Sequence, residues 1–263
     1  DAAEQYLRPW SLELIPRTTA LCFLVTWSSC GARSILGMGT RDVAEAGIAV
    51  GDEVIVPSFG GLEIAEAVRE LGARPVFADV DPDDFCLDPG AAEARVSPRT
   101  AAIVPVHLFG QPANMAGLRA LGARVGARVC AWEPLPRADA VDAVRRRQHA
   151  GYLSRRLRGV VVPPGSAEHA YTSFVVRVPG NGRPDRDAFR RALRLRGVHS
   201  EVPVRVPAHL VPGFRSGVRL PVSEQAADEC LALPLAASMT KRELQHMVSA
   251  CNGLGGLLRE RAS

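Results

Sequence analysis

The chain has 263 residues, of which 47% are hydrophobic and 23% charged, and its formal net charge is +4. These values describe an ordinary globular protein that is long enough to bury a sizeable core. No apolar run reaches the ~18 residues that a membrane span needs, and aromatic residues that would stack on bases are scarce. We therefore expect neither a membrane nor a nucleic acid as partner.

The first half of the chain alternates short apolar runs with helical patterns. The predicted strands are Leu21–Thr26, Glu53–Pro57, Pro75–Ala78, Ala101–Val106 and Ala127–Ala131. The predicted helices lie between them, at about 31–46, 62–71, 90–96 and 115–125. Short apolar runs that alternate with helices are typical of a parallel sheet in an α/β fold.

The pattern changes after the break at Pro134-Leu135-Pro136. The second half predicts a helix at about 138–157, a strand at 171–178, a helix at 186–197, a proline-rich loop at 203–221 and a closing helix at about 241–250. Thr240 and Glu243 fit a capping box at the start of the last helix, and Asn252-Gly253 fits its end. We predict two domains, an α/β domain over 1–136 and a small α+β domain over 137–263.

Cysteine usage and the chain start bear on the compartment. The cysteines Cys22, Cys30, Cys86, Cys130, Cys230 and Cys251 are scattered without a C-x-x-C pair, which favours buried or incidental thiols over zinc ligands or a disulfide framework. No secretion-signal pattern follows Asp1. We expect a cytoplasmic protein and no metal site.

Basic residues are almost all arginine. Lys241 is the only lysine among the 32 lysine and arginine residues. Two arginine-dense stretches, Arg145–Arg158 and Arg183–Arg196, fit solvated faces of amphipathic helices better than a nucleic-acid surface. Arginine stays protonated and cannot form a Schiff base, whereas a lysine can.

Several short sequence motifs follow one another along the chain. They are Gly51-Asp52-Glu53-Val54-Ile55-Val56-Pro57-Ser58-Phe59, Leu71-Gly72-Ala73 through Asp81, Pro98 through Met115 with His107-Leu108-Phe109-Gly110-Gln111-Pro112, His209-Leu210-Val211-Pro212-Gly213-Phe214 and Leu231-Ala232-Leu233-Pro234. Together they resemble the DegT/StrS family of sugar aminotransferases, which depend on pyridoxal phosphate (PLP) and have the fold-type I architecture. The resemblance implies a shortened form of that α/β fold, with 1–136 as the remnant of the large domain.

The phosphate-binding turn of the family is altered. The family places a Ser-Gly-Thr turn after the first strand, whereas this chain has Ser28-Ser29-Cys30-Gly31-Ala32-Arg33. An anion site that uses Ser29 and Arg33 is one interpretation. A plain helix cap by Ser28 or Ser29 is the other.

The positions that hold the pyridine ring are also changed. The family stacks an aromatic ring where this chain has Gly60-Gly61, and it pairs an aspartate with the ring nitrogen where this chain has Trp132 followed by Glu133. Glu63 is either an acid or base or, more simply, a solvated glutamate in the first turn of a helix. About a hundred family residues, including the Schiff-base lysine, have no counterpart between Trp132 and Ala138.

The substrate loop has changed as well. The resemblance aligns a family His-Tyr pair with Pro203-Val204, while His209 matches a later family histidine. Glu201 and Arg205 are polar residues new to this loop. Lys241 lies in the first turn of the closing helix, on a segment that in the family sits far from the cofactor, and the helix dipole there favours solvent exposure, so we do not expect it to form an imine.

These changes predict a protein without PLP or another cofactor, and leave two roles open. The first is a repurposed enzyme of antibiotic or unusual-sugar biosynthesis that cyclises, isomerises or eliminates a small-molecule intermediate, with His107, Glu133 and Glu63 as catalytic candidates. Ser29, Arg33, Trp132, Arg205 and His209 would bind the substrate. His107 also fits a structural position that the family shares.

The second role is a non-catalytic partner or regulatory subunit of an intact aminotransferase. Family members are dimers whose active sites draw on both chains, so the resemblance implies a homodimer or a heterodimer with an intact member. The deletion would leave a sheet edge in need of cover. A decayed gene product is a third, simpler interpretation.

Overall fold

The computed structural model describes residues 48–132, 140–179 and 185–254. Residues 39–263 form one compact unit, and the remaining unit, residues 1–38, lies outside the described part. The predicted strand 21–26 and the predicted helix 31–46 also lie outside it. In the described part, no helix is long and apolar enough to cross a membrane.

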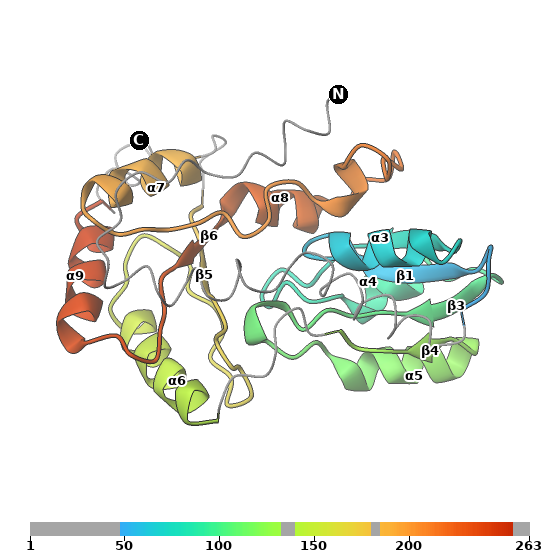
Figure 1. The fold of residues 1–263 in the computed structure, drawn as a ribbon, viewed down its shortest axis with the longest axis horizontal. Coiled ribbons are helices and arrows are strands. Elements are labelled where there is room, and N and C mark those ends of the chain that lie inside the picture. The colour runs from blue at the N-terminus through green and yellow to red at the C-terminus, as the bar shows by residue number, and fades with distance from the viewer. Residues whose placement is uncertain (1–47, 133–139, 180–184, 255–263) are drawn as a thin grey trace. The chain divides into compact units, whose positions relative to one another are not determined.

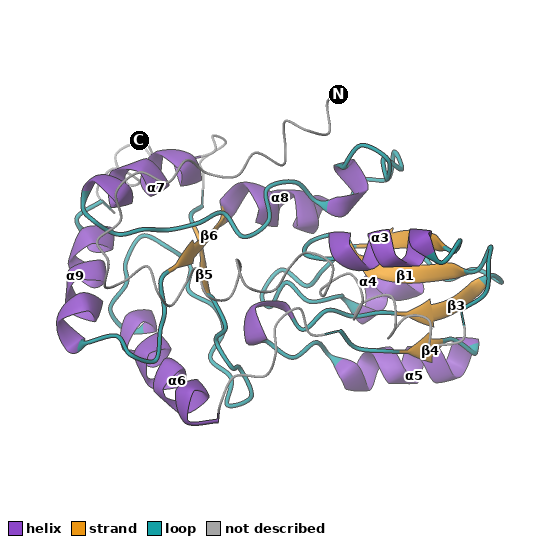
Figure 2. Ribbon diagram, viewed as in Figure 1, coloured by secondary structure: helices purple, strands orange, loops and turns teal. Residues whose placement is uncertain are grey.

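A parallel four-stranded sheet forms the first half of the described chain (Figures 1 and 2). Its strands are β1 (Glu53–Pro57), β2 (Arg74–Ala78), β3 (Thr100–Ile103) and β4 (Arg128–Val129), in the spatial order β2-β1-β3-β4. Every residue of strand β1 is buried; the apolar run from Val54 to Pro57 predicts this, while Glu53 is a buried carboxylate. The α/β fold class expected from the sequence is thus confirmed.

Three helices connect these strands. They are α3 (Leu62–Glu70), α4 (Pro89–Glu93) and α5 (Met115–Val125). Asp88 caps α4 by accepting a hydrogen bond from the Ala91 N–H, and Asn114 caps α5 in the same way from Gly117. Helix α5 is followed by its C-cap Gly126, whose φ of 74° is the left-handed conformation that glycine adopts without strain.

The second half adds a two-stranded antiparallel sheet and four α-helices within the described residues. The strands are β5 (Phe174–Arg177) and β6 (Cys230–Leu233); the helices are α6 (Ala140–Ser154), α7 (Asp185–Leu195), α8 (Pro221–Glu229) and α9 (Lys241–Asn252). The Thr240–Glu243 capping box at the start of α9 is confirmed.

Some predicted boundaries were wrong. The strand expected from Tyr171 begins at Phe174, because Tyr171 has a φ of 46° that no strand residue adopts. The strand expected to reach Val106 ends at Ile103. The region 203–221, predicted as loop, contains the short helix η3 (Ala208–Leu210), and the sequence reasoning missed α8 altogether.

Two hydrophobic cores organise the described residues. One core surrounds β1–β4 and also takes in residues from the second half, namely Val175, Ala208, Phe214, Leu220, Ala226, Ala227 and Cys230. The other packs α6, α7 and α9 around β5 and β6. Side chains from the segment between Ala208 and Cys230 therefore contribute to the core of the parallel sheet.

Candidate functional site

Parallel strands bring their carboxyl ends to one edge of the sheet, which we call the carboxyl edge. Ser58 follows β1, Asp79 follows β2, and His107 lies beyond β3. Ligands of open α/β sheets bind outside this edge, so its side chains are the first candidates for function. Among the predicted site residues, Ser29, Arg33 and Glu133 lie outside the described part.

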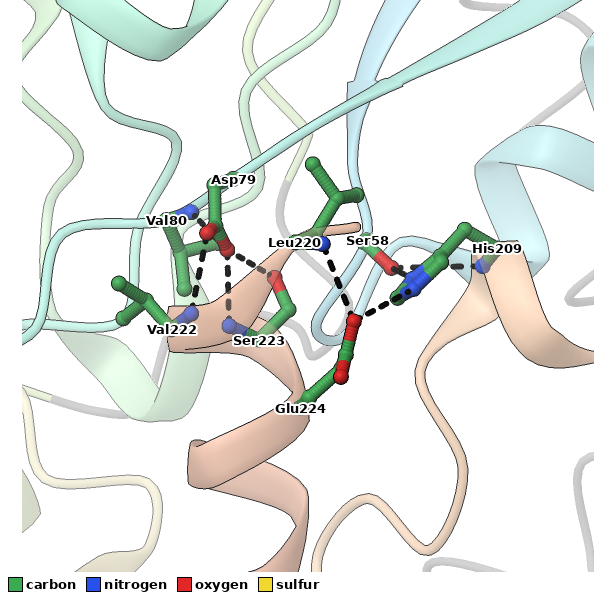
Figure 3. Close-up of polar contacts among 8 residues, drawn as sticks. All are labelled: Ser58, Asp79, Val80, His209, Leu220, Val222, Ser223 and Glu224. Carbon is green, nitrogen blue, oxygen red and sulfur yellow. Dashed lines mark hydrogen bonds and ion pairs between the residues drawn. The ribbon is translucent and has the colours of Figure 1, made fainter. Parts of the chain in front are cut away.

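Ser58 and His209 form a buried hydrogen bond at this edge (Figure 3). The Ser58 Oγ lies 2.6 Å from the His209 Nδ1 and also accepts the His209 backbone N–H at 3.3 Å. Which of the two atoms donates depends on the tautomer of the imidazole: the Ser58 hydroxyl donates to a bare Nδ1, and a protonated Nδ1 donates to the serine oxygen. The exposed fractions of Ser58 and His209 are 1% and 0%.

Glu224 faces the other nitrogen of this imidazole. The His209 Nε2 lies 3.5 Å from the Glu224 Oε1, which accepts a hydrogen bond from the Leu220 N–H at 3.1 Å. The Nε2 atom is buried and makes no closer polar contact in the described part. Serine, histidine and glutamate thus lie in a row, but the serine contacts Nδ1 and the glutamate faces Nε2, which is the reverse of a hydrolytic triad, and the serine is buried.

Asp79 makes a second polar connection between the sheet and α8. Its carboxylate accepts hydrogen bonds from the backbone N–H groups of Val222 and Ser223 and from the Ser223 hydroxyl, at 2.6–3.0 Å. A carboxylate at a helix N-terminus satisfies free N–H groups and complements the helix dipole. Asp79, Ser58 and His209 together fix the segment 208–224 over the ends of β1 and β2.

His107 and Trp132 are brought together by the backbone. The His107 N–H donates to the Trp132 carbonyl at 2.9 Å, and Val106 and Trp132 form a parallel bridge that continues the sheet. The His107 Nδ1 accepts the Ala113 N–H at 3.0 Å, and this bond orders the loop before α5. Trp132 is 7% exposed. Both residues therefore have clear structural contacts.

Glu63 and Arg205 are exposed and, in the described residues, no hydrogen bond or ion pair joins either to another predicted site residue. Partial burial raises the pKa of the Glu63 carboxyl, and the nearby Glu66 carboxylate raises it further. Glu63 lies in the first turn of α3, directly after the end of β1. It is an accessible carboxyl at the carboxyl edge.

A small cavity of about 10 Å³, the size of one water molecule, was not predicted from the sequence. Its lining includes Asp84, Phe85, Phe109, Gln111 and His169. Burial lowers the pKa of His169 to about 4, so this imidazole is neutral at pH 7. Phe85 and Phe109 have φ values of 60° and 58°. Phenylalanine rarely adopts such a conformation, so the sequence does not indicate it.

The turn after β1 is closely packed at the two glycines that the resemblance aligned with the ring-stacking position of the family. A Cβ atom on Gly61 would lie 2.1 Å from the Pro57 carbonyl oxygen, and one on Gly60 would lie 2.6 Å from a Leu108 methyl group. The backbone therefore excludes a side chain at Gly61 without rearrangement. Lys241 is exposed at the start of α9. No group of three or more metal-binding side chains occurs in the described residues.

Comparison with known proteins decides the family. The sequence profile of the DegT/DnrJ/EryC1/StrS aminotransferase family matches residues 22–131 and 130–252. The chain belongs to this family. The resemblance drawn from the motifs is thereby confirmed, and the two matched stretches meet at residues 130 and 131.

Relatives of this DegT/StrS family chain include enzymes and a regulator. A UDP-N-acetyl-3-dehydro-α-D-glucosamine 3-aminotransferase of Acidithiobacillus ferrooxidans is 26% identical over 290 residues, covering 77% of each chain. A pleiotropic regulatory protein of Geobacillus stearothermophilus is 26% identical over 297 residues, covering 77% of this chain and 78% of the relative. An L-glutamine:2-deoxy-scyllo-inosose aminotransferase of Streptomyces paromomycinus is 51% identical over 80 residues, covering 30% of this chain and 19% of the relative.

Solved structures share the fold. DesV of S. venezuelae, crystallised with a ketimine intermediate, superimposes with a TM-score of 0.75 at 22% identity, covering 87% of this chain and 84% of DesV. A family aminotransferase from Brucella abortus gives a TM-score of 0.71 at 19% identity, covering 84% of each chain. The described chain therefore has the fold-type I aminotransferase architecture.

The alignment lengths reveal an internal shortening. The 77% of this 263-residue chain that aligns with the Acidithiobacillus enzyme is about 203 residues, so about 87 of the 290 aligned positions have no counterpart here. The family match breaks at residues 130 and 131, at the end of β4. This agrees with a missing segment close to Trp132.

Proposed function

We propose that this chain works without PLP, on a scaffold derived from sugar aminotransferases. The observation that carries the proposal is the turn after β1. A ring stacked over the cofactor would need a side chain at Gly61, and the Pro57 carbonyl leaves no room for one. The buried Trp132 offers an indole N–H where the family offers a carboxylate, and the single lysine lies on α9. On the alignment that the motifs suggest, these three changes would remove the stacking ring, the partner of the ring nitrogen and the imine-forming lysine together, which supports the proposal.

Equilibrium dialysis with pyridoxamine phosphate tests this proposal, because that form of the cofactor needs no lysine to bind. We expect no saturable binding to the full chain, while an intact sugar aminotransferase measured in parallel retains the compound. Saturable, stoichiometric binding would contradict the proposal, since the remaining residues would then hold the cofactor without an imine.

We further propose that the chain acts as a non-catalytic partner or regulator of an intact aminotransferase of its family. The polar groups of the carboxyl edge support this role. Ser58, His209 and Asp79 hold α8 in place, and His107 orders the loop before α5, so these groups are engaged in structure. One relative of similar coverage is itself named a regulatory protein.

Co-expression with an intact family aminotransferase from the same source tests the partner role. We expect the tagged chain to retain the enzyme through purification and to change its kcat or KM for the sugar substrate. An unrelated PLP enzyme is the control for non-specific retention. If the aminotransferase elutes separately and its kinetics are unchanged at equimolar chain, the partner role is wrong.

Glu63 supports the second candidate role, an enzyme that performs acid/base chemistry on a biosynthetic intermediate. Its carboxyl is exposed at the carboxyl edge, and burial and the nearby Glu66 raise its pKa above the ordinary value, so it holds a proton more readily than a free glutamate does. Turnover of nucleotide-linked keto sugars by the isolated chain, without PLP, is the corresponding assay. The enzyme role requires that Glu63→Gln lose most of that turnover, whereas an unaffected variant would remove Glu63 from the mechanism.

A further inference from the structure

Helices α6, α7 and α9 end close to one another on the second core. The Asn252 side chain, in the last residue of α9, accepts a hydrogen bond from the Arg158 N–H at 2.8 Å and donates one to the Arg156 carbonyl at 2.9 Å. After the end of α7, the Arg196 guanidinium donates to the Ala250 carbonyl of α9 at 2.8 Å. The turns that follow α6 and α7 therefore both lie against the last turn of α9.

The surface at these helix ends is rich in arginine. Its three segments, 151–162, 188–200 and 244–254, contain no aspartate or glutamate. Six of their arginines have exposed side chains, and in the described part of the chain none of the six forms an ion pair. We call these six the basic cluster: Arg155, Arg156, Arg158, Arg191, Arg194 and Arg196.

The rest of the chain does not balance this charge. The residues outside the described part hold eight acidic and eight arginine side chains, so their formal net charge is zero. The net charge of +4 therefore comes from the residues that the structure describes. The residues that follow Leu254 include Arg259, Glu260 and Arg261, which add one more positive charge. As a whole, the undescribed residues thus supply no negative charge to the basic cluster.

Three guanidinium groups of the basic cluster are held in place. Arg156 lies over the Tyr152 ring, with its Cζ atom 4.0 Å from the ring centre. The Arg158 Nη1 donates to the Leu157 carbonyl at 3.2 Å, and Arg196 is fixed by its bond to Ala250. Side chains that are ordered before binding lose less entropy when a partner docks.

The helix ends explain only part of the basic cluster. A cation at the C-terminal end of a helix is favourable, and this accounts for Arg158 and Arg196. The side chains of Arg155, Arg191 and Arg194 form no hydrogen bond or ion pair with any described residue. Like charges on neighbouring turns repel one another, and a bound anion would remove this repulsion.

An exposed leucine lies within the basic cluster. Leu195 follows Arg194, precedes Arg196 and is 90% exposed. Arginine is enriched in protein interfaces, and apolar contact area is typical of their centres. The surface therefore combines cationic side chains with an apolar contact point.

We propose that the basic cluster binds an acidic segment of a partner protein, with an apolar side chain of that segment on Leu195. Planar guanidinium groups bind carboxylates through paired hydrogen bonds. Single-stranded nucleic acids need rings on which bases stack, whereas Tyr152 lies under Arg156 and Phe189 is buried. The proposal goes beyond the roles given above, because it concerns the second core and no residue of the carboxyl edge.

Fluorescence anisotropy of the full chain with a labelled peptide, made of glutamates around a central leucine, tests the proposal. We expect saturable binding that weakens at least about tenfold when the ionic strength is raised from ~0.05 M to ~0.5 M. A variant with Arg155→Glu, Arg191→Glu and Arg194→Glu should bind at least about tenfold more weakly, since opposite charges become like charges. No saturable binding to the native chain would overturn the proposal.

A matched variant controls for net charge. Arg119→Glu, Arg215→Glu and Arg219→Glu replace three exposed arginines outside the basic cluster and change the net charge by the same amount. This control should bind the peptide within about twofold of the native chain, because distant charges are screened. Equal losses in the two triple variants would show an effect of net charge alone and contradict the proposal.

Two further comparisons identify the class of partner. Leu195→Ser should weaken binding of the leucine-containing peptide about threefold or more and leave binding of a pure glutamate peptide unchanged. Double-stranded DNA and vesicles of anionic phospholipid are measured in parallel, and tighter binding of either, lost in the cluster variant, would overturn the assignment to a protein. Thermal unfolding shows that each variant is folded, and the three single substitutions replace the triple variant if it is not.

Discussion

At the scale of single residues, the contact between Ser58 and His209 joins positions 151 residues apart in the chain. The sequence predicted that Ser58 would follow a buried strand, and it named His209 as a candidate on account of the family motif. It could not predict their pairing, because that depends on how the segment 208–224 folds back over the sheet. The same holds for Glu224, which no sequence pattern connects with His209.

Replacement of Ser58 by alanine tests the importance of this contact for stability. The change leaves the His209 Nδ1 buried without a partner, which costs about 1–3 kcal/mol of unfolding free energy. Urea denaturation of Ser58→Ala measures the loss. The matched control is Ser216→Ala at an exposed loop position, where we expect less than ~0.5 kcal/mol. Equal effects in the two variants would show that the buried contact contributes nothing.

Glu53 gives a prediction about pH. It is 5% exposed, and its pKa is lowered by the hydrogen bond from the Ser97 hydroxyl and by Arg99 and Arg74. A carboxyl with a lowered pKa in the folded state adds stability above its unfolded pKa, and this stability is lost as the pH falls through the folded pKa. The contribution should therefore be complete at pH 7 and disappear in the acid range, below the ordinary pKa of a glutamate.

Glu53→Gln should therefore be less stable than the native chain at pH 7, by about 1–2 kcal/mol, since charged hydrogen bonds are lost. The difference should shrink as the pH is lowered below about 4. Guanidinium unfolding at several pH values measures it. A difference that is constant with pH would mean that the carboxylate charge plays no part.

At the scale of elements, local signals predicted most of the first half and less of the second. The bounds of β1 and α5 agree with the sequence patterns because an apolar run and clear caps define them. Helix α8 was missed because Pro221 seemed to continue a proline-rich loop, whereas a proline at the first helical position needs no N–H partner. The late start of β5 follows from the backbone at Tyr171, which the residue type does not reveal.

The turn between β1 and α3 provides an element-scale prediction. Gly61→Ala places a methyl group against the Pro57 carbonyl, which the backbone must move to accommodate, so we expect a loss of at least about 2 kcal/mol. Gly165→Ala is the control, because a Cβ atom there meets nothing within 4 Å. Thermal unfolding compares the two variants. If Gly61→Ala is as stable as the control, the turn has room for a larger side chain and the argument against a stacking ring fails.

At the scale of the whole molecule, the family and its α/β architecture could be predicted from motifs that survive in order. The motifs fix strands, turns and caps, which need little context. The sequence could not show how the second half joins the core around β1–β4, because residues such as Ala208, Phe214 and Leu220 are spaced like those of a loop. It also could not place Ser29, Arg33 or Glu133, and these stay predictions.

The central claim is that this member of an aminotransferase family does not use PLP. The most direct measurement is an absorbance spectrum of the full chain after incubation with PLP and dialysis, followed by borohydride reduction and mass spectrometry. We predict no band of a protein-bound imine and no specific mass increase, and Lys241→Ala should give the same spectrum. A persistent visible band, with a reduced adduct on Lys241 that the Lys241→Ala variant lacks, would contradict the account.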